Sequence, residues 1–158
     1  MNGTSIVMFA THGLAPGGLP GLAQPALTMA VDPSSNELPL LTLDDVVGLR
    51  MNADWVLLSA CNTSAAERVG GDALSGLARG FFFAGAKSLL VTHWEVDSES
   101  AANITVKTIE KYASNPKITR AQALQSASID LIEGKQVPSE WAHPAFWAPY
   151  ALVGNGRR

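Results

Sequence analysis

Cysteine is scarce in this sequence, and its scarcity excludes two kinds of site. Cys61 is the one cysteine among 158 residues, so a disulfide within the chain and a metal site built from several cysteines are both excluded. No acids and histidines stand at metal-site spacing either, and we expect no cofactor. A lone cysteine also fits a reducing compartment, so we expect a cytoplasmic protein.

Long apolar runs and clusters of basic residues are also missing. The first apolar stretch, residues 6–10, is too short for a signal peptide or a membrane-spanning helix. Eleven lysines and arginines face 14 acidic residues, which gives a formal net charge of −3 with no basic stripe. We therefore expect neither a nucleic-acid partner nor a membrane partner.

The chain does have enough apolar residues for one domain, residues 1–158, with a normal core, because 47% of its residues are hydrophobic. Continuous apolar segments predict buried strands, and apolar residues at helical spacing predict helices between them. The strands are expected at 6–10, 54–59 and 88–93, and the helices at 72–85, 98–112 and 119–132. This alternation predicts an α/β fold with a mostly parallel sheet and helices on both faces.

Weaker signals fill the remaining segments. Residues 26–31 and 38–41 predict a hairpin, and Thr42 is a good N-cap for a short helix, with Asp45 in the capping-box position. Ser98 is expected to cap the helix that begins there. Residues 146–153, after His143-Pro144, predict a final strand.

The strand at 6–10 is apolar on both faces, which is typical of the middle of a parallel sheet. It begins almost at the first residue, so we expect the chain to be the C-terminal part of a larger domain. Without preceding strands, the strand would lie exposed at a sheet edge, where backbone groups are free to pair with another chain. We therefore predict a homodimer through the edge of strand 6–10.

His12 and Cys61 each follow one of the predicted buried strands, and parallel strands carry their ligands beyond their carboxyl ends. If these strands are neighbours, the imidazole and the thiol converge. An ordinary thiol has a pKa of about 8.5 and is mostly protonated at neutral pH, so a nearby imidazole activates it. The N–H groups of Gly13 and Cys61 would form an oxyanion-binding pair.

Taken singly, each residue has a more ordinary explanation. A lone cysteine after an apolar strand is usually a small buried hydrophobe, and a histidine beside glycine is often only a turn residue. Their joint placement, 49 residues apart and after two strands, favours a catalytic dyad.

Five ordered strings then resemble a known family. They are A-T-H-G (10–13), L-S-A-C-N-T (58–63), G-L-A-R-G-F-F-F-A-G-A (76–86), H-W-E-V-D (93–97) and H-P-A-F-W-A-P-Y-A-L-V-G (143–154). Together they resemble CHAT domains, the caspase-like peptidase domains related to separases. The resemblance implies a caspase–hemoglobinase fold, here its C-terminal portion, with His12 as the catalytic histidine and Cys61 as the nucleophile.

Two departures accompany this resemblance. The family has further strands and a helix before the histidine strand, and it usually has leucine where His93 stands. We interpret His93 as a strand-end residue.

Similarity to separases also implies that residues 94–97 border the pocket for the substrate residue before the cut. Glu95 or Asp97 there would favour lysine or arginine through a charge-assisted hydrogen bond. An equally good interpretation is that Asp97 caps the following helix.

Three functions remain open on the sequence. The first is a cysteine endopeptidase that acts on a protein or peptide substrate through an acyl-enzyme. The second is a non-catalytic interaction or oligomerisation module, and the third is an acyl-transferase or amidase that uses the same dyad.

Overall fold

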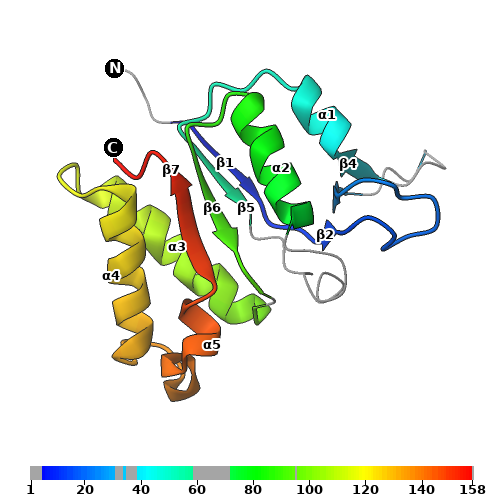
Figure 1. Cartoon of the computed structure of the whole chain (residues 1–158). Helices are drawn as coiled ribbons and strands as arrows, with labels where there is room; N and C mark the ends of the chain where they lie inside the picture. The colour runs from blue at the N-terminus through cyan, green and yellow to red at the C-terminus, as the bar shows by residue number, and fades with distance from the viewer. Residues whose placement is uncertain (1–4, 31–33, 35–38, 59–71, 95, 158) are drawn as a thin grey trace.

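A four-stranded sheet forms the centre of the fold (Figure 1). The computed structural model describes residues 5–30, 34, 39–58, 72–94 and 96–157. The strand order is β1-β5-β6-β7, where the strands are β1 (Ile6–Phe9), β5 (Trp55–Leu58), β6 (Ser88–Thr92) and β7 (Tyr150–Gly154). The first three run parallel and β7 runs antiparallel to β6, so the prediction of an α/β fold with a mostly parallel sheet is confirmed.

The two predicted buried strands differ in their surroundings. All four residues of β5 are buried, because β5 pairs with a strand on each side and is covered on both faces. β1 lies at the edge of the described sheet, and Met8 on it is 42% exposed. The prediction of a buried strand is therefore correct for β5, whereas β1 is only partly buried. The place of β1 at the edge of the described sheet, with one strand neighbour, agrees with the expectation of an exposed edge.

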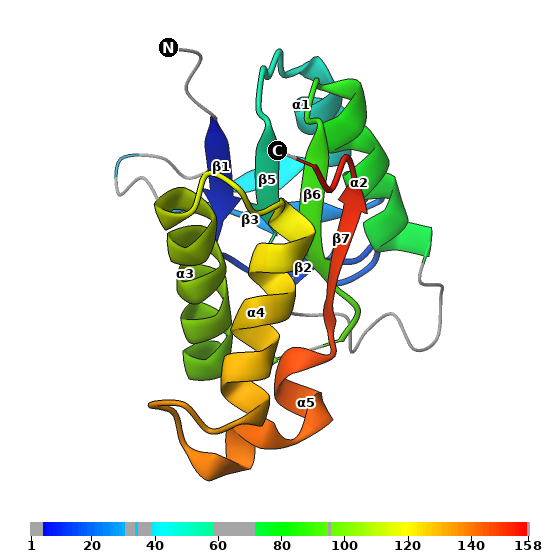
Figure 2. The same ribbon diagram turned by 90° about the vertical axis from the view of Figure 1, so that its left-hand side faces the viewer.

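Helices cover both faces of the sheet (Figures 1 and 2). One face is covered by α1 (Leu43–Gly48) and α2 (Asp72–Phe83), and the other by α3 (Ser98–Ser114) and α4 (Arg120–Ile132). This arrangement follows from the period of two along β5. Val56 and Leu58 pack with α1 and α2, whereas Trp55 and Leu57 pack with α3 and α4.

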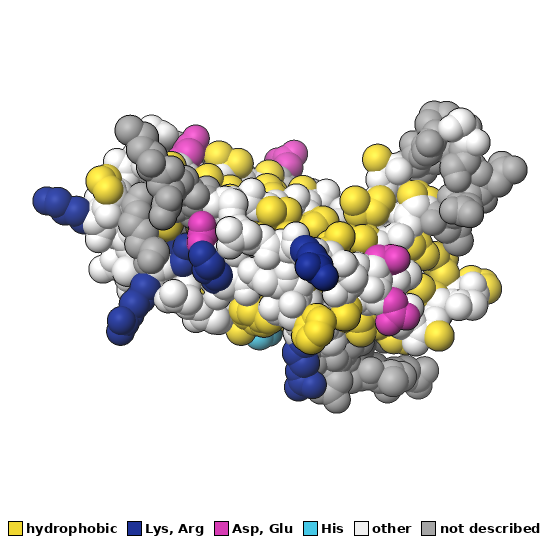
Figure 3. Space-filling view, turned by 90° about the horizontal axis from the view of Figure 1, so that it is seen from above, with side chains coloured by type: hydrophobic (Ala, Val, Ile, Leu, Met, Phe, Trp, Pro, Cys, Tyr) yellow, Lys and Arg dark blue, Asp and Glu magenta, His cyan; other side chains and the backbone are white. Residues whose placement is uncertain are grey.

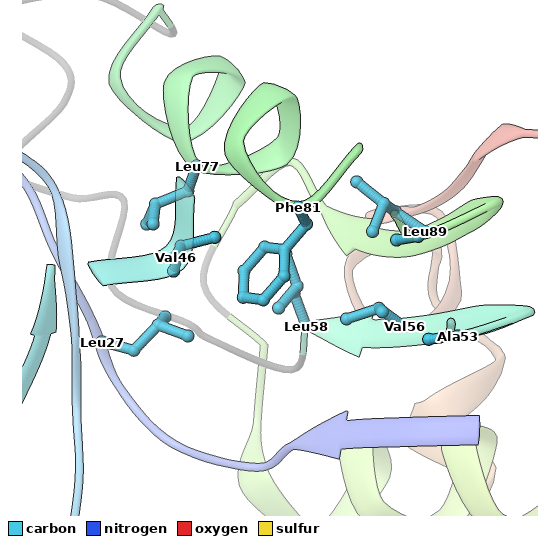
Figure 4. Packing of buried hydrophobic residues seen from close by; sticks show 9 residues of the cluster. Leu27, Val46, Ala53, Val56, Leu58, Leu77, Phe81 and Leu89 are labelled. Carbon is cyan, nitrogen blue, oxygen red and sulfur yellow. The ribbon is translucent and has the colours of Figure 1, made fainter. Parts of the chain in front are cut away.

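The core beneath α1 and α2 extends from the large sheet toward β3 (Figure 4). Phe81 of α2 is fully buried there, and its ring centroid lies 5.2 Å from that of Phe9 on β1. Leu27 of β3 belongs to the same cluster. One hydrophobic core therefore holds the edge strand and the second sheet together.

The second sheet is small and antiparallel. Its order is β2-β3-β4, where the strands are β2 (Gly13–Leu14), β3 (Ala26–Thr28) and β4 (Leu40–Thr42). The predicted pairing of the 26–31 and 38–41 segments is confirmed, with Leu27 opposite Leu41. β2 follows β1 after three residues, so the chain passes directly from the large sheet to the small one.

Capping residues set most of the helix starts. Thr42 and Asp45 form the expected capping box at α1, and Thr119 forms one with Gln122 at α4. For α3 the N-cap is Asp97 rather than Ser98, because the Asp97 carboxylate accepts a hydrogen bond from the third helical N–H, that of Ser100.

Glycine is required at the end of α2. Gly85 has a φ of +106°, and a Cβ there would lie 2.0 Å from the Met51 carbonyl oxygen.

The final segment differs from the prediction in its first half. Residues 146 and 147 belong to a short helix, α5 (Pro144–Trp147), which follows the 3₁₀ helix η2 (Ser139–Ala142). The reason is local, since His143 accepts the Ala145 N–H through its side chain and proline is well suited to the first helical position. The strand β7 then runs from Tyr150 to Gly154, as the second half of the prediction required.

Candidate active site

The carboxyl ends of β1, β5 and β6 lie at the same edge of the sheet (Figure 1). His12 follows β1 at this edge, in the link between β1 and β2, and its side chain is exposed. Cys61 follows β5 in the sequence but lies outside the described residues. The structure thus brings the two strand ends together as neighbours, with His12 next to one of them.

The pairing of β1 with β5 has the same residue offset as the predicted dyad. Phe9 pairs with Leu58, and the offset is 49 residues throughout the ladder. His12 and Cys61 are also 49 residues apart, so each lies three residues beyond a pair of partners in the sheet. The sequence spacing therefore matches the register of the two strands.

Hydrogen bonds from β3 hold the backbone of His12. The N–H of Thr28 donates to the His12 carbonyl oxygen at 2.9 Å, and the Thr28 hydroxyl lies 3.4 Å from the same oxygen. Thr11 adds a second tie, since its hydroxyl donates to the Thr28 carbonyl oxygen at 2.5 Å. Neither threonine was predicted as a site residue. Thr11 is adjacent to His12 in the sequence, whereas no sequence signal pointed to Thr28.

Gly13, the predicted oxyanion residue, is buried and is the first residue of β2. It stands opposite Leu27, and the bond from Thr28 N–H to the His12 carbonyl makes Gly13 and Leu27 a non-hydrogen-bonded pair. In such a pair the N–H groups are directed away from the partner strand. The Gly13 N–H is therefore not used by the β2–β3 ladder.

The predicted pocket segment begins directly after β6. Glu95 lies outside the described residues, and Asp97 is the N-cap of α3, with its Oδ1 2.9 Å from the Ser100 nitrogen. The capping interpretation of Asp97 is thus confirmed, and its contribution to a substrate pocket stays a prediction. The Asp97 carboxylate is exposed, which is compatible with both interpretations.

Trp94 stands out in the same segment because it is large, apolar and 43% exposed. Its Nε1–H donates to the carbonyl oxygen of Ala145 in α5 at 3.3 Å. The neighbouring His93 is exposed, as expected for a strand-end residue, and its N–H donates to the Pro149 carbonyl oxygen at 2.9 Å. Residues 143–154, the last of the five strings, thus support the loop that follows β6 through these two hydrogen bonds. The sequence alone did not reveal this contact.

Two acidic residues away from this edge, Asp54 and Asp45, are held by hydrogen bonds that serve the fold. Lys87 donates to Asp54 at 2.6 Å, and this bond, together with the Ser5 N–H, holds the pKa of the Asp54 carboxyl below its ordinary value. Asp45 also has a lowered pKa, because the Thr42 hydroxyl and backbone N–H donate to it. Seen from above, the molecule shows charged side chains of both signs scattered among hydrophobic ones (Figure 3), so this face carries no single-sign patch.

Two kinds of feature are absent from the part of the chain that the structure describes. Its histidines and acidic residues form no group of three or more that could hold a metal ion. Among the described helices, none has the length and apolar character needed to cross a membrane.

Comparison with known proteins agrees with this geometry. The family model of the CHAT domain matches residues 1–155. The chain is also similar to human tetratricopeptide repeat protein 28, with 28% identity over 116 residues that cover 73% of this chain. That stretch is 4% of the human protein's own length.

Proposed function

This chain belongs to the CHAT domain family, whose members are caspase-like domains related to peptidases, and from that premise we propose that it is a cysteine endopeptidase with His12 and Cys61 as its dyad. The substrate is a protein or peptide. The observation that carries the proposal is the match between the dyad spacing and the β1–β5 register.

The proposed reaction uses ordinary thiol chemistry. His12 accepts the proton of the Cys61 thiol, the sulfur attacks the scissile carbonyl carbon, and the carbonyl oxygen becomes an oxyanion. The N–H groups of Gly13 and Cys61 donate to this oxyanion. His12 then gives the proton to the departing amine as the C–N bond breaks, and water, deprotonated by His12, hydrolyses the thioester.

Specificity is proposed to come from the segment after β6. The carboxylates of Glu95 and Asp97 would favour lysine or arginine before the cut through charge-assisted hydrogen bonds. The surface position of Asp97 supports this part of the proposal, because its carboxylate can reach a substrate while it caps α3.

The test is the pH dependence of Cys61 alkylation by iodoacetamide, compared between wild type and His12→Ala. At pH 6.5 an ordinary thiol is about 1% thiolate, whereas a thiol with its pKa lowered to about 6.5 is half ionised. The activated thiolate is intrinsically about 8-fold less nucleophilic, so a net advantage of about 6-fold remains. We expect this advantage in wild type and its loss in His12→Ala. If both proteins react as an ordinary thiol does, the dyad proposal is wrong.

A second function is favoured by the position of β1. This strand lies at the edge of the described sheet with Met8 42% exposed, and strand edges offer unpaired backbone groups to another chain. We propose that the edge of β1 pairs with β1 of a second copy and forms a homodimer. Size-exclusion chromatography over a range of concentrations should show a dimer, and a monomer at every concentration would contradict this proposal.

A further inference from the structure

We propose that Thr28, acting with Thr11, is a positioning residue that fixes His12 for its work in the dyad. The inference rests on the proposed function and names residues outside the dyad that its activity needs. Thr28 lies on β3, 16 residues beyond His12 in the chain, and contacts it through the pairing of β2 with β3.

Four contacts join Thr28 to the segment that contains Thr11 and His12. The Thr28 N–H donates to the His12 carbonyl oxygen at 2.9 Å. The Thr11 hydroxyl lies 2.5 Å from the Thr28 carbonyl oxygen and 2.8 Å from the Thr28 hydroxyl. The Thr28 hydroxyl is in turn 3.4 Å from the His12 carbonyl oxygen.

The number of hydroxyl protons decides how these contacts are made. Each hydroxyl has one proton to donate and two lone pairs to accept with. The short contact to the Thr28 carbonyl takes the Thr11 proton, so the Thr28 hydroxyl donates to Thr11 Oγ1 or to the His12 carbonyl. In both cases the Thr28 hydroxyl holds a residue of the 11–12 link.

The support beneath Thr28 is rigid. Ala26 and Leu27, the other residues of β3, have no exposed surface, and Leu27 packs in the core cluster of Figure 4. Thr28 is itself β-branched, so its hydroxyl has few rotamers. The position of His12 is therefore fixed against the hydrophobic core rather than against another surface loop.

Such fixing matters because the link that contains His12 is otherwise exposed. Three residues connect β1 to β2, and His12 itself is exposed. Proton transfer requires the imidazole within hydrogen-bond reach of the thiol, and a misplacement of about 1 Å costs on the order of 10²-fold in rate. Loss of the threonine contacts should thus weaken the activation of Cys61 while the fold persists.

The experiment compares Thr28→Val and Thr28→Ser by the pH profile of Cys61 alkylation. Valine keeps the shape and the backbone N–H of residue 28 but removes the hydroxyl, whereas serine keeps the hydroxyl. We expect Thr28→Val to reduce the advantage over His12→Ala at pH 6.5 from about 6-fold to less than about 2-fold. Thr28→Ser should retain most of it. Thr11→Val removes the tie from the other side and should behave like Thr28→Val.

The matched control is Thr108→Val on α3. The Thr108 hydroxyl is buried and donates to the Ile104 carbonyl oxygen at 2.6 Å, so this change also removes a threonine hydrogen bond, but from a site away from the sheet edge. It should leave the alkylation profile unchanged. Urea unfolding of each variant shows that the folded protein is being compared.

The outcomes separate this inference from the proposal on which it rests. If wild type and His12→Ala share an ordinary profile, the dyad fails and this inference fails with it. If they differ but both valine variants keep the wild-type profile, the dyad stands and the positioning role is wrong. If Thr108→Val shifts the profile as Thr28→Val does, the effect is general loosening, and the positioning role is again wrong.

Discussion

Substitution of Asp97 separates its observed role, the capping of α3, from its proposed role, the recognition of a basic substrate residue. Asparagine keeps an oxygen that can accept the Ser100 N–H, at present 2.9 Å from the carboxylate, but carries no charge. Alanine removes both the acceptor and the charge. The pair therefore divides the effect of Asp97 into a hydrogen-bond part and a charge part.

The expected magnitudes follow from the position of Asp97 at the N-cap. Loss of an N-cap acceptor costs about 1 kcal/mol. Loss of a negative charge at a helix N-terminus costs about 0.3–1 kcal/mol, and the low end applies here because Asp97 is exposed. We therefore expect Asp97→Asn to lower the unfolding free energy by about 0.3 kcal/mol and Asp97→Ala by about 1.3 kcal/mol. For a domain of this size the alanine change corresponds to about 3–5 °C in Tm.

Urea denaturation measures the contribution of Asp97 to helix capping. Cleavage of matched peptides with lysine or leucine before the cut measures its contribution to substrate recognition. If Asp97 lines the pocket, asparagine should lower the lysine-to-leucine ratio of kcat/KM although it leaves stability nearly intact. An unchanged ratio in Asp97→Asn would refute the pocket role, and equal destabilisation by asparagine and alanine would refute the capping argument. Thr119→Val, which removes the N-cap acceptor of α4, is the control for loss of a cap away from the site.

Two further predictions concern the strand edge and the pH dependence of folding. Met8→Lys puts a like charge on each copy at the proposed β1–β1 contact and should shift size-exclusion profiles toward the monomer. Val153→Lys, on the opposite edge strand at a residue that is 40% exposed, should not shift them. Equal behaviour of the two variants would contradict the β1 interface. Asp54→Asn should destabilise the fold at neutral pH, because the lowered pKa of Asp54 means that its carboxylate contributes stability above the ordinary pKa of 3.8. That contribution is lost as the pH falls through the lowered value, so urea unfolding should show the gap between wild type and Asp54→Asn closing below about pH 4; a gap that stays constant down to pH 2 would contradict the assignment.

Local pattern was enough to predict most of the elements. β5 was predicted correctly because a strand covered on both faces needs apolar residues at every position, and residues 55–58 supply them. The capped start of α1 was visible because its capping box lies within four residues. The aromatic residues at 146–147 misled the same reasoning, since a cap at His143 and a proline after it outweighed their preference for strands.

The surroundings of the candidate site depended on contacts that no local pattern encodes. Thr28 reaches His12 only because Gly13 pairs with Leu27, a register set by the small sheet. Trp94 meets Ala145 across 51 residues for a similar reason, since β7 returns antiparallel beside β6. The proposed dyad could therefore be inferred from spacing, whereas the threonines that contact the His12 segment could not.

The two proposed functions of this chain depend on different contacts of residues 6–12. The edge of β1 that would pair with a second copy faces away from β5, whereas His12 is tied to β3 through Thr28. Phe9 anchors the end of β1 against Phe81, so a change at the outer edge is separated from His12 by a packed ring contact. Dimerisation and thiol activation should thus be independent. Met8→Lys should abolish the dimer and leave the pH profile of Cys61 alkylation unchanged, and a profile that follows the oligomeric state would mean that the second copy contributes to the site.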